Sequence, residues 1–298
     1  MVLTGLALAL TLAQGPAPRQ AAPQTDETVS VQRGGRLNVN NYAGEVIVRT
    51  WDKDSVRVLA RHQPRTRVGI RPTSSGLSIS TSGSMGPAGS VDFEITAPAW
   101  MPVRIEGTYN FVTVEGAQAE VYANTMSGDV IIKGGTGVVT AKSVQGEVRV
   151  DGARGKVTAS SVNEQVRISS TTGDITAETV NGDISMTGID SKSVDATTVN
   201  GTITFEGKLA DGGHYAFGTH NGNIAMGLPE ANNATFTIRT YQGSISSDFT
   251  LDGYNRAEPQ RGRRVVATLG NGSADVNLET FGGAIRLRKG PVARPRAR

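Results

Sequence analysis

Apolar and polar positions alternate over most of this chain, and the alternation returns in short copies of one pattern. Each copy begins apolar–polar–apolar, reaches a Ser or Thr at its fifth position, and closes on a turn that is most often Asn-Gly, Gln-Gly or Ser-Gly. Alternation with a period of two residues predicts half-buried strands. Eight copies follow the pattern, and they begin at Val121, Val139, Val157, Ile175, Val194, Tyr215, Phe236 and Val276.

The spacing of the copies predicts a repeat architecture. The first five copies begin 18, 18, 18 and 19 residues apart, and the next two steps are 21 residues each. A second strand follows each turn, with apolar residues two and four places after the Gly, as at Ile203 and Phe205. Because the same residue types recur at the same places, we predict in-register stacking in an all-β fold. The expected fold is a β-solenoid similar to a single-stranded β-helix, with coils of 18–21 residues. The alternative is an antiparallel meander, since Asn-Gly between strands also predicts hairpins.

The positions within each copy predict which side chains form the core. The first, third and fifth positions should share one face, because successive strand side chains point to opposite sides. We expect the hydroxyl at the fifth position to bond the backbone of the following turn. We expect the Gly to supply the positive φ of a sharp corner. The copy that ends at Asn163 and Glu164 lacks this Gly, so its corner must be built differently.

The chain is expected to divide into five segments. A short apolar run within residues 1–13 is typical of a secretory signal peptide, although no Lys or Arg precedes Arg19. The alternative is an apolar N-terminus on a cytoplasmic protein. Residues 14–25 are expected to form a linker, 26–107 an irregular β region that caps the stack, 108–290 the solenoid, and 291–298 a basic tail. We therefore expect an extracytoplasmic protein, located in the periplasm, at the outer surface or outside the cell, without a transmembrane segment in its mature chain.

Composition agrees with many turns and a thin core, because the chain has 37 Gly and only 5% aromatic residues. It has no Cys, which excludes disulfides, thiol catalysis and cysteine metal sites. Residues 256–298 hold ten Lys and Arg against three Asp and Glu, an excess of +7 in a chain of net charge +3. Such an end can contact anionic polymers or lipid head groups, or can simply be a solvated terminus. The candidate basic patch is Arg261, Arg263, Arg264, Arg286, Arg288 and Lys289.

The polar residues offer little chemistry. Asp129, Glu147 and Asp183 follow the turn Gly in three copies, and a row of carboxylates can bind Ca²⁺ or act as a hydrolase pair. Neutral residues interrupt this row, so solvated turn acids are expected instead. The three histidines, His62, His214 and His220, lack an evident third ligand for zinc. We predict no catalytic residue, no cofactor and no metal site.

The position two residues before the turn Gly is the candidate interaction site. Strict alternation points it outward and predicts an exposed ridge for ligand binding or self-association. The alternative is that the chain bends at the corner and turns the column into the core. The ridge comprises Met126, Val144, Val162, Val180, Val199, His220, Tyr241 and Phe281.

Several motifs together resemble a known family. They are Tyr42-Ala-Gly44 followed by Val46 and Val48, Trp51-Asp52 followed by Val56 and Val58, Ile95-Thr-Ala-Pro98 with Val103 and Ile105, the repeats ending in Ser127-Gly128, Asn181-Gly182, Asn200-Gly201 and Asn221-Gly222, and the closing Gly270-Asn-Gly272, Val276 to Thr280 and Ile285 to Lys289. Over residues 26–290 the chain is similar to the adhesin-type β-strand repeat family of exported bacterial proteins, DUF4097. The resemblance implies a non-enzymatic, exported, solenoid-like protein with no catalytic residues to transfer.

The expected function is therefore an adhesin-like scaffold in the cell envelope, with a polysaccharide or another envelope component as partner and no specific nucleic-acid ligand. One alternative is a carbohydrate-active β-helix enzyme that acts on acidic polysaccharide, which requires an acid pair beside Arg or Lys in a groove. Another is a structural element that assembles end to end.

Overall fold

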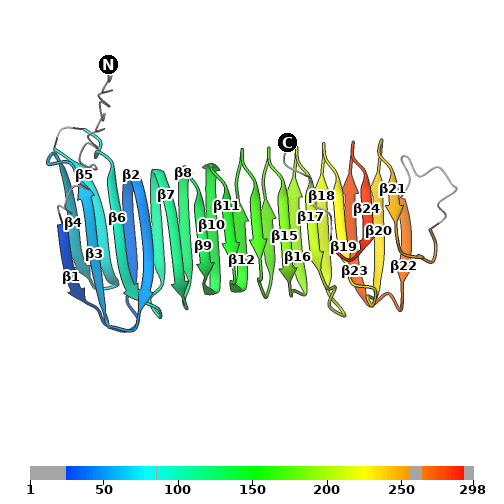
Figure 1. Cartoon of the computed structure of the whole chain (residues 1–298), viewed down its shortest axis with the longest axis horizontal. Helices are drawn as coiled ribbons and strands as arrows, with labels where there is room; N and C mark the ends of the chain where they lie inside the picture. The colour runs from blue at the N-terminus through cyan, green and yellow to red at the C-terminus, as the bar shows by residue number, and fades with distance from the viewer. Residues whose placement is uncertain (1–24, 85, 255–263, 292–298) are drawn as a thin grey trace, which may run out of the picture.

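The chain forms one long, flat stack of β-strands (Figure 1). A computed structural model describes residues 25–84, 86–254 and 264–291. These residues form 24 strands, and none of them belongs to a helix that could cross a membrane.

The strands fall into an N-terminal group, six regular coils of two strands each, and a C-terminal group. The N-terminal strands are β1 (Thr25–Ser30), β2 (Arg36–Trp51), β3 (Ser55–His62), β4 (Thr66–Thr73), β5 (Gly76–Gly83), β6 (Val91–Pro98) and β7 (Val103–Ala117). The regular coils contain β8 (Val121–Ser127), β9 (Val130–Gly134), β10 (Thr136–Gln145), β11 (Val148–Asp151), β12 (Arg154–Ser160), β13 (Val166–Ser169), β14 (Ile175–Glu178), β15 (Ile184–Ile189), β16 (Ser193–Thr198), β17 (Ile203–Gly207), β18 (His214–Thr219) and β19 (Ile224–Leu228). The C-terminal strands are β20 (Ala234–Thr240), β21 (Ile245–Ser247), β22 (Arg264–Leu269), β23 (Ala274–Thr280) and β24 (Ile285–Lys289).

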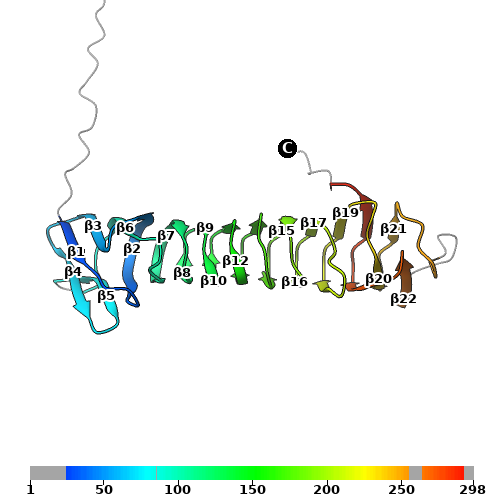
Figure 2. The same ribbon diagram turned by 90° about the horizontal axis from the view of Figure 1, so that it is seen from below.

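The regular coils are parallel and in register, which confirms the solenoid and excludes the meander. First strands pair with first strands along β8, β10, β12, β14, β16 and β18, and second strands pair with second strands along β9, β11, β13, β15, β17 and β19. Val139 lies between Val121 and Val157, so identical positions of successive copies become neighbours. The two rows make two layers that enclose the core (Figure 2). We call the β8 row the first layer and the β9 row the second layer.

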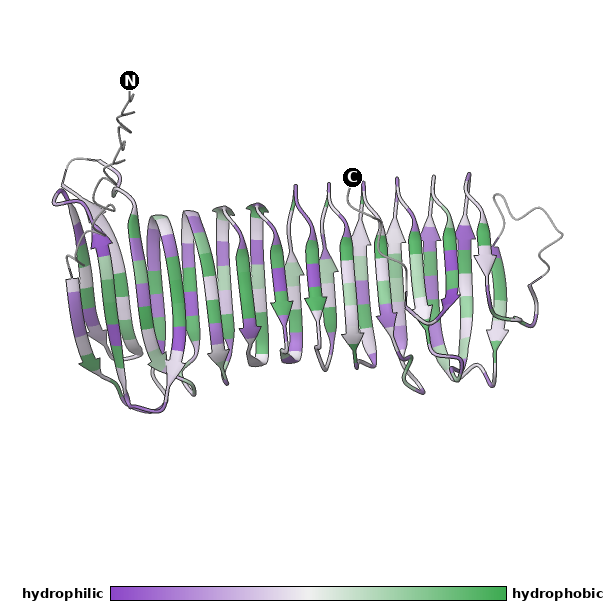
Figure 3. Cartoon of the chain, viewed as in Figure 1, coloured by the Kyte–Doolittle hydropathy of each residue, from purple (hydrophilic) through white to green (hydrophobic). Residues whose placement is uncertain are grey.

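The core is thin in the middle of the stack and thicker near its C-terminal end. Small buried side chains such as Ala141 and Ala159 alternate with half-buried or exposed polar ones, which gives the banded strands of Figure 3. Farther along, Phe205 packs 5.4 Å from Phe217, centroid to centroid. Tyr215 is fully buried there, and burial raises the pKa of its phenol. Its hydroxyl donates to the carbonyl of Ser191, so the buried polar atom is satisfied.

The fifth position of every copy is buried, as expected, but its hydroxyl binds the neighbouring coil. Ser143 donates to the carbonyl of Gly128 at 2.9 Å, and Thr198 donates to that of Gly182 at 3.0 Å. In some coils the same oxygen also accepts from its own turn, as in the 3.0 Å bond from the Gly243 N–H to Thr240. The column therefore joins successive corners to one another. Its members are Thr125, Ser143, Ser161, Thr179, Thr198, Thr219, Thr240 and Thr280.

The turn glycines serve close packing, and the expectation of a positive φ is wrong for most of them. Gly128 has a φ of 111°, but Gly146, Gly182, Gly201 and Gly222 do not lie in the positive region. A Cβ at Gly201 would overlap the carbonyl oxygen of Gly182 in the adjacent coil. Glycine is needed because successive corners approach backbone to backbone.

The order of the coils in space departs from their order in the chain. The last coil, β23 and β24, lies between the β18–β19 coil and the β20–β21 coil, so the red strands sit between yellow and orange ones in Figure 1. The N-terminal end shows the same arrangement, because β2 lies between β7 and the later strands β5 and β6. At each end, therefore, the chain runs outward to form the terminal strands and then returns to add a strand nearer the middle of the stack.

Antiparallel strands cover the N-terminal end of both layers and the C-terminal end of the first layer, whereas the second layer ends at the parallel strand β21. β4 pairs with β5, β3 pairs with β6, β1 pairs with β3, and β22 pairs with β20, all antiparallel. The outermost strand β4 carries Arg67, Arg71 and Pro72. Charged residues and proline discourage edge-to-edge pairing, so this edge at the N-terminal end is protected against continued stacking.

Candidate functional site

The candidate ridge lies on the outside of the corner that joins the two strands of each coil. Met126, Val144, Val180, Val199 and Phe281 are between 38% and 59% exposed. His220 is also exposed, and Val162 and Tyr241 are half-buried. The inward hydroxyl at the fifth position keeps the strand alternation intact up to the corner, so the next side chain points out. The column is therefore a surface feature and not part of the core.

A ladder of asparagine side chains runs beside the ridge. Asn181 donates from Nδ2 to Oδ1 of Asn163 at 3.1 Å, Asn200 donates to Asn181 at 2.9 Å, and Asn221 donates to Asn200 at 2.9 Å. Each amide follows a ridge residue directly in the sequence. The edge of the stack thus presents an apolar row and a parallel row of aligned amides.

The inserted coil completes the ridge at its C-terminal end. Phe281 stacks on His220 at 4.8 Å with an interplanar angle of 14°, and Tyr241 follows at 5.4 Å from Phe281. Copy order in the sequence would place Tyr241 next to His220 instead. The ridge is continuous over eight coils because β23 and β24 fill the intervening position.

Replacing Gly282 by Asn is expected to lengthen the ladder by one amide. A Cβ at Gly282 would lie 3.7 Å from Oδ1 of Asn221, at ordinary contact distance, and Gly282 does not have a positive φ. The new amide can donate to Asn221, and losing a glycine lowers the entropy of the unfolded chain. We expect a gain of about 0.5–1 kcal/mol in the free energy of unfolding, measured by urea denaturation. A destabilised variant would contradict this account of the ladder.

The carboxylates that follow the turn Gly bind other groups of the same chain. Asp129 accepts from the backbone N–H of Glu147 at 2.8 Å, and Asp183 accepts from that of Thr202 at 2.7 Å. Glu147 also pairs with Arg149 and Arg167. Across the described ranges, no three His, Asp or Glu side chains are arranged to hold a metal ion. These acids complete the hydrogen bonding of the next coil.

The four candidate basic residues that the structure describes do not gather into one patch. Arg264 lies on β22 in the first layer, whereas Arg286 and Arg288 lie on β24 in the second. Lys289 forms a 2.8 Å ion pair with Glu230 and lies over the ring of Phe249. The other two candidates, Arg261 and Arg263, lie outside the described residues, as do the signal-peptide and basic-tail segments. The two layers face opposite sides, so the four described candidates do not form one basic surface.

The three histidines make separate contacts. His214 pairs with Asp275 at 3.2 Å, both side chains being exposed. Nε2 of His62 and the hydroxyl of Thr25 are joined by one hydrogen bond of 3.1 Å near the N-terminal end. His220 belongs to the ridge, so the three do not form a shared site.

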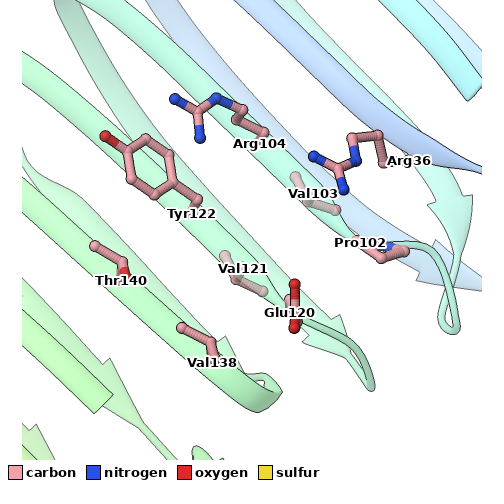
Figure 4. Close-up of a pocket in the computed structure, with 9 residues that line it drawn as sticks. All are labelled: Arg36, Pro102, Val103, Arg104, Glu120, Val121, Tyr122, Val138 and Thr140. Carbon is pink, nitrogen blue, oxygen red and sulfur yellow. The ribbon is translucent and has the colours of Figure 1, made fainter. Parts of the chain in front are cut away.

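Two hollows interrupt the surface. A depression of about 160 Å³ on the first layer has Arg36, Arg104, Glu120 and Tyr122 around it (Figure 4). Arg104 lies 4.1 Å from the Tyr122 ring centroid and is paired with Glu106. This hollow is below the volume of about 300–1,000 Å³ that encloses a small ligand, and it offers one carboxylate instead of an acid pair. A second hollow, of about 510 Å³, lies at the N-terminal end and is lined by residues 29–35, 72–74, 76 and 77, which include no acid.

Two features escaped the sequence reasoning. Asn41 and Asn110 are fully buried and bonded to each other, with Nδ2 of Asn41 donating to Oδ1 of Asn110 at 2.7 Å. Asn110 fills the space of the missing side chain at Gly107, which occupies the hydroxyl column of its coil. This inward amide leaves Tyr109 and Phe111 exposed beside it. The sequence feature that could have indicated this arrangement is an Asn placed between two aromatic residues.

The fold and its edge define a class: a parallel β-solenoid with two strands per coil, capped ends and a regular apolar edge. The family model described as Toastrack DUF4097 matches residues 120–288, more than half of the chain. The chain belongs to this family.

Two solved structures are similar at low sequence identity. One is described as a candidate cell adhesion protein from Clostridium sporogenes, with 11% identity, a TM-score of 0.20, and coverage of 89% of this chain and 100% of that one. The other is described as a candidate adhesin from Bacteroides fragilis, with 12% identity, a TM-score of 0.42, and coverage of 90% and 99%. The comparison with curated proteins gave no match.

Proposed function

We propose that this protein is an exported, non-enzymatic, adhesin-like scaffold that binds an extended polymer of the cell envelope along its ridge. The observation that carries the proposal is the continuous row from Met126 to Tyr241 on the outside of the corner, in which six of the eight side chains are exposed and two are half-buried, with the Asn ladder beside it. Neighbouring coils lie about 4.8 Å apart, so the edge offers regularly repeated apolar and hydrogen-bonding contacts. A linear ligand can use many of them at once.

The rest of the molecule favours binding over turnover. The hollow on the first layer has one carboxylate, whereas glycoside hydrolysis uses two on opposite sides of the scissile bond. The carboxylates of the corner are engaged with backbone N–H groups. Charges and proline on β4 disfavour the pairing of a further strand at that edge of the N-terminal end.

The test compares paired valine substitutions of similar exposure. Val180→Asn with Val199→Asn interrupts the ridge, and Val138→Asn with Val266→Asn changes two exposed valines elsewhere. Both double variants and the wild type are applied to an array of purified envelope polysaccharides and peptidoglycan. We expect the ridge variant to lose about tenfold in affinity, equivalent to about 1.4 kcal/mol, while the control variant binds as the wild type does.

Three further outcomes would contradict the proposal: equal binding by both variants, release of soluble products from the polymer, or no retention on any polymer. Sedimentation velocity on the same samples detects self-association. Concentration-dependent filaments would favour the structural-element alternative instead.

A further inference from the structure

Three exposed aromatic side chains lie at the corner of the N-terminal coils, beyond the ridge. Tyr42 on β2, Tyr109 and Phe111 on β7 are 38%, 55% and 58% exposed. The residue between the last two, Asn110, is turned inward and donates to the carbonyl of Asn41 at 2.8 Å. Because strand side chains alternate, this buried amide holds both neighbouring rings on the outside. We call these three side chains the aromatic corner.

Two rings of the aromatic corner stand nearly at right angles. The centroids of Tyr42 and Tyr109 are 5.7 Å apart, with an interplanar angle of 81°. In this edge-to-face arrangement, the ring that points its edge at its neighbour has neither of its own faces covered by that neighbour. Phe111 lies two residues farther along the same strand than Tyr109 and is also exposed.

Carboxylates flank the aromatic corner on both sides. Glu45 is the register partner of Phe111 on β2, and the Asp92 carboxylate accepts from the Glu45 N–H at 3.0 Å. On the opposite side, the Asp129 carbonyl accepts from Val112, which places Asp129 beside the same row. Over the described ranges, none of these three acids forms an ion pair with Lys, Arg or His. Three carboxylates without an ion-pair partner among the described residues thus lie beside the aromatic corner.

Other rings of this protein already hold a cation from the chain itself. Arg104 lies over Tyr122 at 4.1 Å, and Arg239 lies over Tyr241 at 4.6 Å. Trp51, Trp100 and Phe249 have similar partners. Within the part of the chain that the structure describes, no Lys or Arg covers the aromatic corner. Ring faces attract cations. The rings of the aromatic corner are therefore open to a cation that does not belong to this chain.

We propose that the aromatic corner binds a quaternary ammonium group, such as that of choline. Its methyl groups can contact the uncovered ring faces, and its charge matches those faces and the carboxylates of Glu45 and Asp129. A methylated cation is also weakly hydrated, so it loses little on leaving water. The site is separate from the polymer-binding role of the ridge and does not depend on it.

The test is a titration of the full chain with choline, followed by NMR of the tyrosine rings. The control ligand is 3,3-dimethylbutanol, which has the same shape without the charge. We expect choline to bind in the millimolar range and the neutral analogue to bind about tenfold more weakly. Tyr109→Leu should lose about tenfold in affinity, and Tyr109→Phe should retain it, because the phenyl ring keeps its face. Glu45→Gln should weaken binding about threefold.

Matched controls separate this site from the rest of the molecule. Tyr122→Leu removes a ring that already holds Arg104, and it should bind choline as the wild type does. The ridge variant with Val180→Asn and Val199→Asn should also keep choline binding, so failure of one proposal is distinguishable from failure of the other. Equal binding of the neutral analogue, or full binding by Tyr109→Leu, would overturn the inference.

A second arm identifies the source of the cation. Phosphatidylcholine vesicles are compared with phosphatidylglycerol vesicles in a flotation assay. Flotation with phosphatidylcholine alone, lost in Tyr109→Leu, supports a lipid head group. Choline binding without flotation supports a soluble or polymer-bound quaternary ammonium ligand. Preference for phosphatidylglycerol would contradict the charge argument.

Discussion

Deletion of residues 274–298 is expected to abolish the native fold of the C-terminal third of the protein. The deletion removes β23 and β24, which supply the buried side chains of Val276, Leu278, Ile285 and Leu287. Each fully buried side chain of this size contributes about 1.5–3 kcal/mol. Four of them approach the total stability of a domain, about 5–15 kcal/mol. In most solenoids the C-terminal coil is a cap, but here it lies inside the stack.

A shorter deletion provides the control. Removing residues 292–298 leaves β24 in place and should leave the unfolding midpoint unchanged. Circular dichroism during thermal unfolding, together with limited proteolysis, measures both variants. If the longer deletion unfolded at the wild-type temperature, β20 and β21 would have to stack directly on β18 and β19, and the proposed coil order would be wrong.

Gly201→Ala is expected to lower the free energy of unfolding by about 2–4 kcal/mol. The added Cβ would overlap the carbonyl oxygen of Gly182, so the two corners would have to move apart. That movement would also strain the Thr198 hydrogen bond to the same carbonyl and the Asn200 bond to Asn181. Urea denaturation measures the change.

Gly218→Ala is the matched control in the adjacent coil. Its new Cβ would meet only Oγ1 of Thr197, at 3.9 Å, and its φ is not positive. We expect a neutral effect or a gain of about 0.4–1 kcal/mol. If both alanines were equally mild, close approach of the corners would not explain the glycine column.

The columns of the repeat were predictable because in-register stacking turns sequence periodicity directly into contacts. Val139, Ala141 and Ser143 are all buried, as alternation requires, and Val144 is exposed at the next position. Each coil contacts a similar coil above and below it, so the environment of one position recurs from coil to coil. The sequence could not decide between an outward and an inward Val144 because a corner can either continue or break the alternation.

The order of the coils could not be predicted from these columns. The copies that begin at Tyr215, Phe236 and Val276 satisfy the same pattern, so any of them fits beside any other. Their actual order depends on antiparallel pairing between β20 and β22, which the repeat does not encode. Asn110 escaped prediction for a related reason, because its role comes from an absent side chain at Gly107 in its own coil.

The binding surfaces depend on this same order. Phe281 stands between His220 and Tyr241 only because β23 is inserted, and without it the ridge would lose one of its three C-terminal rings. At the other end, β2 lies against β7 through the same kind of insertion, and this brings Tyr42 to Tyr109. The C-terminal part of the ridge and the aromatic corner are therefore consequences of strands that return into the stack.

Disulfide trapping tests the inserted coil most directly, since the chain has no cysteine of its own. Gly218 and Glu279 are register partners, about 4.8 Å apart across adjacent parallel strands. Gly218 and Arg239 are separated by two strand spacings, about 9.6 Å, beyond the Cα distance that a disulfide can bridge. The account predicts rapid oxidation of Gly218→Cys with Glu279→Cys, and no cross-link for Gly218→Cys with Arg239→Cys. Efficient cross-linking of the second pair instead of the first would contradict it.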